Sequence, residues 1–176
     1  MGSLLITLLR HSDRVTTACQ AQLVNTISSI RAEPGGPAWR QSIFHPFAQA
    51  ARLAKGNVLR VELKSPFYET AEYGSVPVVD TVATYDEERG GLSILAVNRD
   101  QSQPVELSVD LRAFAALRVD EATALTDEDI TAANTAEQPD RVAPRPAQGV
   151  SIDGGTLHAT LPPVSWNALR LVPSGQ

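Results

Sequence analysis

Residues 18–25 have the sequence Ala-Cys-Gln-Ala-Gln-Leu-Val-Asn, and residues 33–47 have the sequence Glu-Pro-Gly-Gly-Pro-Ala-Trp-Arg-Gln-Ser-Ile-Phe-His-Pro-Phe. The first run is mostly apolar and predicts a strand buried on both faces, as the strands of a parallel sheet are. The prolines and glycines of residues 31–37 predict a sharp turn after it. Residues 38–55 then predict a helix, with a kink or a late start at Pro46.

A second apolar segment precedes this unit. Residues 3–11 place their leucines on one helical face. Residues 1–55 are therefore expected to form a helix, a strand and a helix, which is the order at the end of a (β/α)8 barrel. Almost nothing that could form the other barrel strands comes before them, so we expect the chain to begin inside a domain, with a partial barrel segment.

The spacing of apolar residues changes to a period of two after Gly56. In Val105–Arg112, apolar and polar residues alternate throughout. Residues 86–91, Asp-Glu-Glu-Arg-Gly-Gly, predict a hairpin turn, because glycine readily adopts the positive φ that such turns need. Further strands are expected at residues 58–64, 79–85, 92–98, 117–125, 156–161 and 166–172. This pattern predicts a mainly β fold, an antiparallel jelly-roll β-sandwich over residues 56–176, with an ordered loop at residues 126–148.

Composition and charge exclude several classes of function. The 176 residues include 15 basic and 20 acidic side chains, for a formal net charge of -5, and the basic residues are scattered. This argues against a nucleic-acid partner, because phosphate binding needs clustered Lys and Arg. The apolar run Leu4–Leu9 is too short to cross a bilayer. We therefore expect a cytoplasmic protein with no membrane partner.

No motif for metal or covalent chemistry is present. His11, His45 and His158 lie far apart without a second His or Cys at ligand spacing, and they are expected at the surface or in capping positions, so no metal site is assigned. Cys19, the single cysteine, is expected to be a small buried hydrophobe. A retaining glycosidase needs two carboxyl groups about 5–5.5 Å apart. Glu33 is the only carboxylate near the end of the expected barrel strand, so no catalytic residue is assigned.

A few polar and aromatic residues remain as candidate sugar contacts. An amide in an apolar strand costs about 1–3 kcal/mol unless it is hydrogen-bonded. Gln22 therefore predicts either a buried amide bonded to neighbouring backbone or an amide that points from a strand end into a sugar-binding pocket. Asn25 is expected to cap the following turn. Trp39 and Trp166 could stack on a sugar, although core positions are expected for both.

Six blocks of the sequence are similar to one enzyme family, in the same order and over essentially the whole chain. Two of them are Ala-Gln-Leu-Val-Asn at residues 21–25 and Leu-Pro-Pro-Val-Ser-Trp-Asn at residues 161–167. The others are residues 3–15, 33–41, 96–100 and 134–142. In these blocks the chain resembles the C-terminal third of the α-L-arabinofuranosidases of glycoside hydrolase family fifty-one.

The resemblance implies a catalytic (β/α)8 barrel followed by a jelly-roll β-sandwich. It implies retaining hydrolysis of terminal α-L-arabinofuranosyl groups from arabinan and arabinoxylan, without a metal or organic cofactor, by an enzyme that is often intracellular and homo-oligomeric. The family's glutamine at the end of the eighth barrel strand matches Gln22 and contacts the arabinosyl ring. Both catalytic glutamates of the family, and an N-terminal strand that helps to complete the sandwich, belong to parts that precede Met1.

Three hypotheses about function follow. The first is that the chain is the C-terminal region of such an enzyme, divided into residues 1–55 and 56–176. It would need the missing barrel portion, and alone it would be inactive on arabinose-containing oligosaccharides. The second is a carbohydrate-binding jelly roll. The third is a structural sandwich that supports the barrel and homo-oligomer formation.

Overall fold

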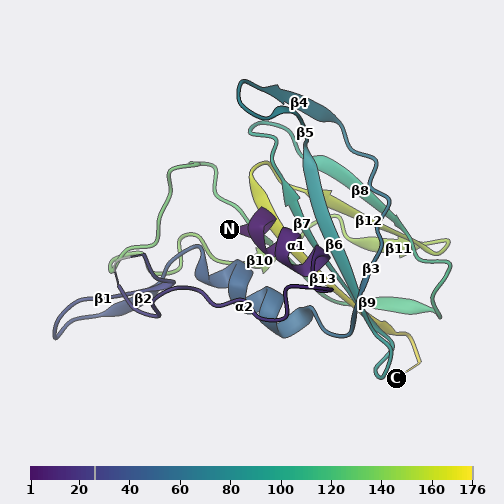
Figure 1. The fold of residues 1–176 in the computed structure, drawn as a ribbon, viewed down its shortest axis with the longest axis horizontal. Helices are drawn as coiled ribbons and strands as arrows, with labels where there is room; N and C mark the ends of the chain where they lie inside the picture. Colours follow the sequence, from purple (N-terminus) through teal and green to yellow (C-terminus); the bar gives the residue numbers. More distant parts are fainter. Residues whose placement is uncertain (26, 176) are drawn as a thin grey trace.

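The computed structural model describes residues 1–25 and 27–175. Two antiparallel sheets pack face to face, and two helices, α1 (Gly2–Arg10) and α2 (Phe44–Leu53), cover the outer face of the larger sheet (Figure 1). The larger sheet has the strand order β10 (Arg145–Pro146), β9 (Leu117–Leu125), β13 (Ser165–Pro173), β7 (Gly91–Asn98), β6 (Val79–Asp86) and β3 (Asn57–Leu59). The smaller sheet has the order β11 (Ser151–Asp153), β12 (Thr156–Leu161) and β8 (Val105–Asp110). Two separate hairpins are β1 (Ile30–Ala32) with β2 (Ala38–Arg40), and β4 (Phe67–Thr70) with β5 (Gly74–Pro77).

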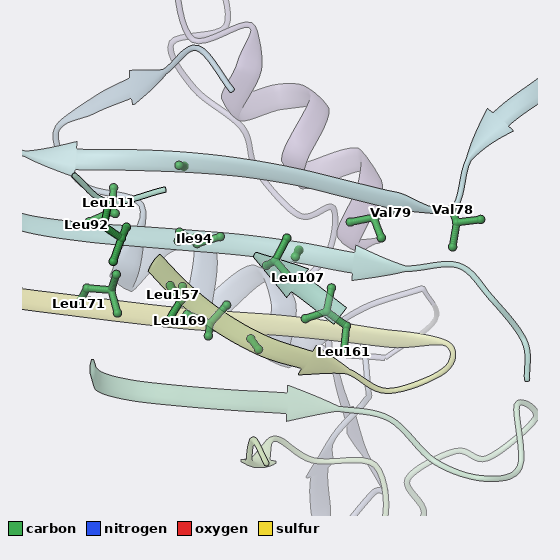
Figure 2. Close-up of a cluster of buried hydrophobic side chains, with 13 residues drawn as sticks. Val78, Val79, Leu92, Ile94, Leu107, Leu111, Leu157, Leu161, Leu169 and Leu171 are labelled. Carbon is green, nitrogen blue, oxygen red and sulfur yellow. The ribbon is translucent and has the colours of Figure 1, made fainter. Parts of the chain in front are cut away.

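The main core lies between the two sheets. Ile94 and Leu169 come from the larger sheet and face Leu107 and Leu157 of the smaller one (Figure 2). These side chains are buried. The two sheets therefore share one apolar layer, which is the arrangement that defines a β-sandwich.

A second apolar cluster lies on the opposite face of the larger sheet, under the helices. Leu5 and Ile6 of α1 and Leu53 of α2 pack there against Leu95 and Trp166. Successive residues of a strand point to opposite faces, so Leu95 faces the helices while its neighbours face the sandwich core. Strands β6, β7 and β13 are consequently buried on both faces, so that even polar residues of β6 such as Asp80 and Thr84 are buried.

The mainly β fold and most of the expected strands are confirmed. Strands β6 and β7 flank the turn predicted at residues 86–91, where Gly90 adopts a φ of 63°. The helix expected over residues 38–55 begins only at Phe44. Pro46 therefore lies in its first turn, where the missing N–H costs no helical hydrogen bond. No helix among the described residues is long and apolar enough to cross a membrane.

Three expectations about individual segments are wrong. Residues 18–25 form no strand, and Cys19 is exposed rather than buried. A strand needs hydrogen-bonded neighbours, and within the described part of the chain this run makes only a single parallel bridge, from Val24 to Ile30. The strand expected at residues 58–64 is limited to β3, which ends at Leu59.

A candidate substrate-binding segment

Gln22 lies on an exposed segment outside every sheet of the described chain. Its φ of 51° and the φ of 62° at Asn25 are in the left-handed region, which non-glycine residues seldom adopt without support from their surroundings. Because the Gln22 side chain is exposed, the interpretation as a buried amide bonded to backbone is wrong. The alternative, an amide available to a ligand, is compatible with this geometry.

Asn25 supplies the local support. Its side-chain Oδ1 accepts a hydrogen bond from the N–H of Ala32 at 2.7 Å, and its own N–H donates to the carbonyl of Ile30 at 2.8 Å. The carbonyl of Asn25 also accepts from the N–H of Ser28 at 3.0 Å. Asn25 therefore closes the turn that follows Gln22, as expected for a capping residue, and ties this turn to strand β1.

The β1–β2 hairpin carries the Pro-Gly-rich stretch at its tip. The N–H of Glu33 donates to the carbonyl of Pro37 at 3.0 Å, and Gly35 adopts a φ of 67°, so glycine is suited to this turn. The Glu33 side chain is exposed. In the middle of β2, Trp39 is half-buried and its Nε1 donates to the carbonyl of Asn134 at 2.9 Å. Trp166, in contrast, is a core residue, as expected.

Several carboxylates are paired with arginine. Asp80 is buried and accepts hydrogen bonds from Arg10 and Arg99, at 2.5 and 2.7 Å. The Arg52 guanidinium lowers the pKa of Glu121 through hydrogen bonds. A general acid at neutral pH needs the opposite, a raised carboxyl pKa. The Arg52–Glu121 pair therefore joins α2 to β9 and is unsuited to general-acid catalysis.

The next question is whether metal-binding side chains or a histidine could form a site. The described residues contain no group of three His, Cys, Asp or Glu side chains arranged to hold a metal ion. His45 is buried in α2, so the expectation that it lies at the surface is wrong. Burial lowers the pKa of His45, the nearby Arg40 lowers it further, and Asp140 opposes both. Its Nε2 has no hydrogen-bond partner among residues 1–25 and 27–175.

An apolar cavity of about 620 Å³ lies between the two sheets, beside the edge strand β8. Leu63 lines it from the segment after β3, and Val109 and Phe114 line it from β8 and the turn that follows. The cavity walls are mainly apolar, which suits a further hydrophobic segment better than a sugar.

Sequence comparison matches residues 1–165 to the family described as "Alpha-L-arabinofuranosidase C-terminal domain". An "Intracellular exo-alpha-(1->5)-L-arabinofuranosidase" of Streptomyces lividans is 48% identical over 169 residues, which are 96% of this chain and 25% of the relative. An "Exo-alpha-(1->6)-L-arabinofuranosidase" of Bifidobacterium longum is 45% identical over 173 residues, 97% of this chain and 33% of the relative. The chain thus spans about a quarter to a third of the length of these relatives.

Solved structures show the same similarity. A family 51 α-L-arabinofuranosidase from Bifidobacterium longum superposes with a TM-score of 0.88 at 44% identity, over 96% of this chain and 33% of that protein. The family 51 arabinofuranosidase from Xanthomonas axonopodis pv. citri gives a TM-score of 0.84 at 28% identity, over 96% of this chain and 35% of that protein. The helices, hairpins and sandwich therefore occur together in larger proteins.

Proposed function

Because the chain belongs to the α-L-arabinofuranosidase C-terminal domain family, we propose that it forms the C-terminal part of an enzyme that removes terminal α-L-arabinofuranosyl groups. The observation that carries this proposal is the match over residues 1–165, which includes the segment around Gln22 and every strand of the sandwich before β13. Arabinose-containing oligosaccharides are the proposed substrates. The proposed location is the cytoplasm, which the word "intracellular" in the names of several relatives supports.

The exposed apolar residues of the N-terminal part support a contact with a catalytic barrel portion. Leu4, Leu23 and Ile27 all expose most of their side chains to solvent. Residues 1–55 would complete the barrel, and residues 56–176 would form the attached sandwich. The apolar cavity beside β8 would accept a strand from the N-terminal part of the enzyme, and the assembled protein is proposed to be a homo-oligomer.

Gln22 is the proposed substrate contact. Its side chain is exposed at the end of the segment that would be the last barrel strand, and active sites of such barrels lie at the C-terminal ends of the strands. A glutamine amide can donate to one sugar hydroxyl and accept from another. Two carboxylates from the barrel portion would perform the displacement, so this chain alone would bind no substrate productively and would have no activity.

A chimera tests this proposal. This chain would replace the matching third of the Bifidobacterium longum family 51 enzyme, and hydrolysis of p-nitrophenyl α-L-arabinofuranoside would be measured. We expect the chimera to be active and the isolated chain to be inactive. Gln22→Ala should lower kcat/KM by about 10- to 100-fold, because one or two hydrogen bonds to the sugar are lost.

Gln101→Ala is the matched control, because Gln101 is an exposed glutamine in the turn between β7 and β8. It should leave kcat/KM unchanged. A folded but inactive chimera would contradict the proposed function of the chain. An active chimera in which Gln22→Ala behaves like Gln101→Ala would contradict the role of Gln22.

A further inference from the structure

The long segment between β9 and β10 is joined to the β1–β2 hairpin by one buried asparagine. Asn134 is only 7% exposed. Its Nδ2 donates to the carbonyl of Arg40 in β2 at 2.9 Å and to the carbonyl of Val142 at 3.0 Å. Its Oδ1 accepts from the N–H of Val142 at 2.7 Å. The Asn134 amide therefore closes its own loop and attaches that loop to the hairpin at the same time.

The hairpin returns the contact. Trp39 precedes Arg40 in β2, and its indole Nε1 donates to the main-chain carbonyl of Asn134 at 2.9 Å. Figure 1 shows the green segment between β9 and β10 extending to the β1–β2 hairpin. Two hydrogen bonds in opposite directions thus connect a loop of the sandwich to a hairpin about 95 residues earlier in the chain.

The same hairpin holds the segment of Gln22. Strand β1 contacts this segment through the two hydrogen bonds of Asn25 and the bridge between Val24 and Ile30. After β2, the Gln41 N–H donates to the carbonyl of Ser29 at 2.8 Å. The positive φ values at Gln22 and Asn25 mean that this backbone depends on such contacts to keep its conformation.

We propose that Asn134 is a positioning residue for the substrate-binding segment. It holds β2, which pairs with β1, and β1 in turn fixes the turn that follows Gln22. Asn134 would touch no substrate and would act only through this path. The inference rests on the proposed substrate contact of Gln22. The sandwich would thereby affect the rate of hydrolysis, because a small displacement of the Gln22 amide from the substrate reduces the rate substantially.

The first part of the test measures the physical link in this 176-residue chain, by amide hydrogen exchange. Asn134→Ala removes all three hydrogen bonds of the side chain. Asn134→Asp keeps the acceptor for the Val142 N–H but removes the donor to Arg40. We expect both variants to accelerate exchange at the amides of Asn25 and Ala32 by about tenfold. The loss of one hydrogen bond lowers the free energy of local opening by about 1.4 kcal/mol, which corresponds to a tenfold change in the opening equilibrium.

Asn98→Ala is the matched control. Asn98 is also a buried asparagine, and its Nδ2 donates to three carbonyls, those of Gln103, Leu161 and Pro162. These contacts lie within the sandwich, so its loss should not accelerate exchange at residues 22–32 selectively. Unchanged exchange at Asn25 and Ala32 in both Asn134 variants would overturn the proposal.

The second part uses the chimera and a double-mutant cycle. Asn134→Asp should lower kcat/KM for the aryl arabinofuranoside. In the double variant with Gln22→Ala, it should cause little further loss, because both changes act on the same contact. Losses that multiply independently would show a general structural role and would overturn the positioning path. If Gln22→Ala alone has no effect, the proposed substrate contact fails, while hydrogen exchange still reports separately on the physical link.

Discussion

The buried carboxylate of Asp80 offers the sharpest test of how α1 is held on the sandwich. Its side chain is 7% exposed and accepts from Arg10 of α1 at 2.5 Å and from Arg99 at 2.7 Å. Arg99 also donates to the carbonyl of Pro77 and to Ser3 of α1. We consider Asp80→Asn, which keeps the shape of the side chain but removes its charge and one acceptor.

The magnitude follows from the exposure of the two arginines. Removing one partner of a fully buried ion pair costs about 3–5 kcal/mol. The Arg10 side chain is 42% exposed and can turn to water, so its contribution is small, whereas Arg99 is only 22% exposed. We therefore expect a loss of about 2–3 kcal/mol in the free energy of unfolding. With a urea m-value of about 2 kcal/mol/M, the midpoint should fall by about 1–1.5 M.

Urea denaturation followed by circular dichroism measures this loss. Asp120→Asn is the matched control, because Asp120 also faces two arginines, Arg118 at 3.6 Å and Arg170 at 3.5 Å, but is 42% exposed. It should cost less than about 0.5 kcal/mol. If Asp80→Asn shifts the midpoint no more than Asp120→Asn at the same m-value, the buried ion pairs of Asp80 contribute no more to stability than the exposed pairs of Asp120. That result would refute the estimate from burial.

Two further predictions concern the core and the dependence on pH. Leu157→Ala removes a fully buried side chain between the sheets and should lower the free energy of unfolding in urea by about 3–4 kcal/mol. The control Ile130→Ala, at an exposed position, should change it by less than about 0.5 kcal/mol. Equal losses in the two variants would contradict the assigned core. The pKa of His45 is lowered in the folded protein, so on acidification the unfolded chain binds the proton first. The free energy of unfolding should therefore fall as the pH drops below about 6.5, the pKa of a histidine in the unfolded chain. His45→Gln should give a shallower decrease between pH 7.5 and 5.5, and an unchanged slope would exclude His45 as the cause.

Strands and their turns were largely predictable, because their signals are local. The alternation in β8 and the glycines after β6 lie within the segments that they specify. The burial of β6, β7 and β13 on both faces was not predicted, because it depends on the packing of α1 and α2 against the outer face. The late start of α2 was predicted as one of two alternatives at Pro46, and the structure selects it.

The candidate site was harder to predict. Gln22 was unusual as an amide within a mostly apolar run, and the family resemblance suggested its role. Its neighbours in space could not be identified from the sequence. Asn134 lies in a segment expected only to be an ordered loop, and its main partner outside that loop, the carbonyl of Arg40, is 94 residues away. No periodicity encodes such a contact, because the hydrogen bond is to backbone and so requires no particular residue at the other end.

The amino-acid sequence by itself determined the β-rich character of this protein and the positions of its main strands along the chain. Each of these depends on residue types and on spacings of a few residues. Only the tertiary structure decided that residues 18–25 form no strand and that a sandwich loop is tied to their turn. Strand formation and such contacts require hydrogen-bonding partners from distant parts of the chain, and folding alone brings those partners together.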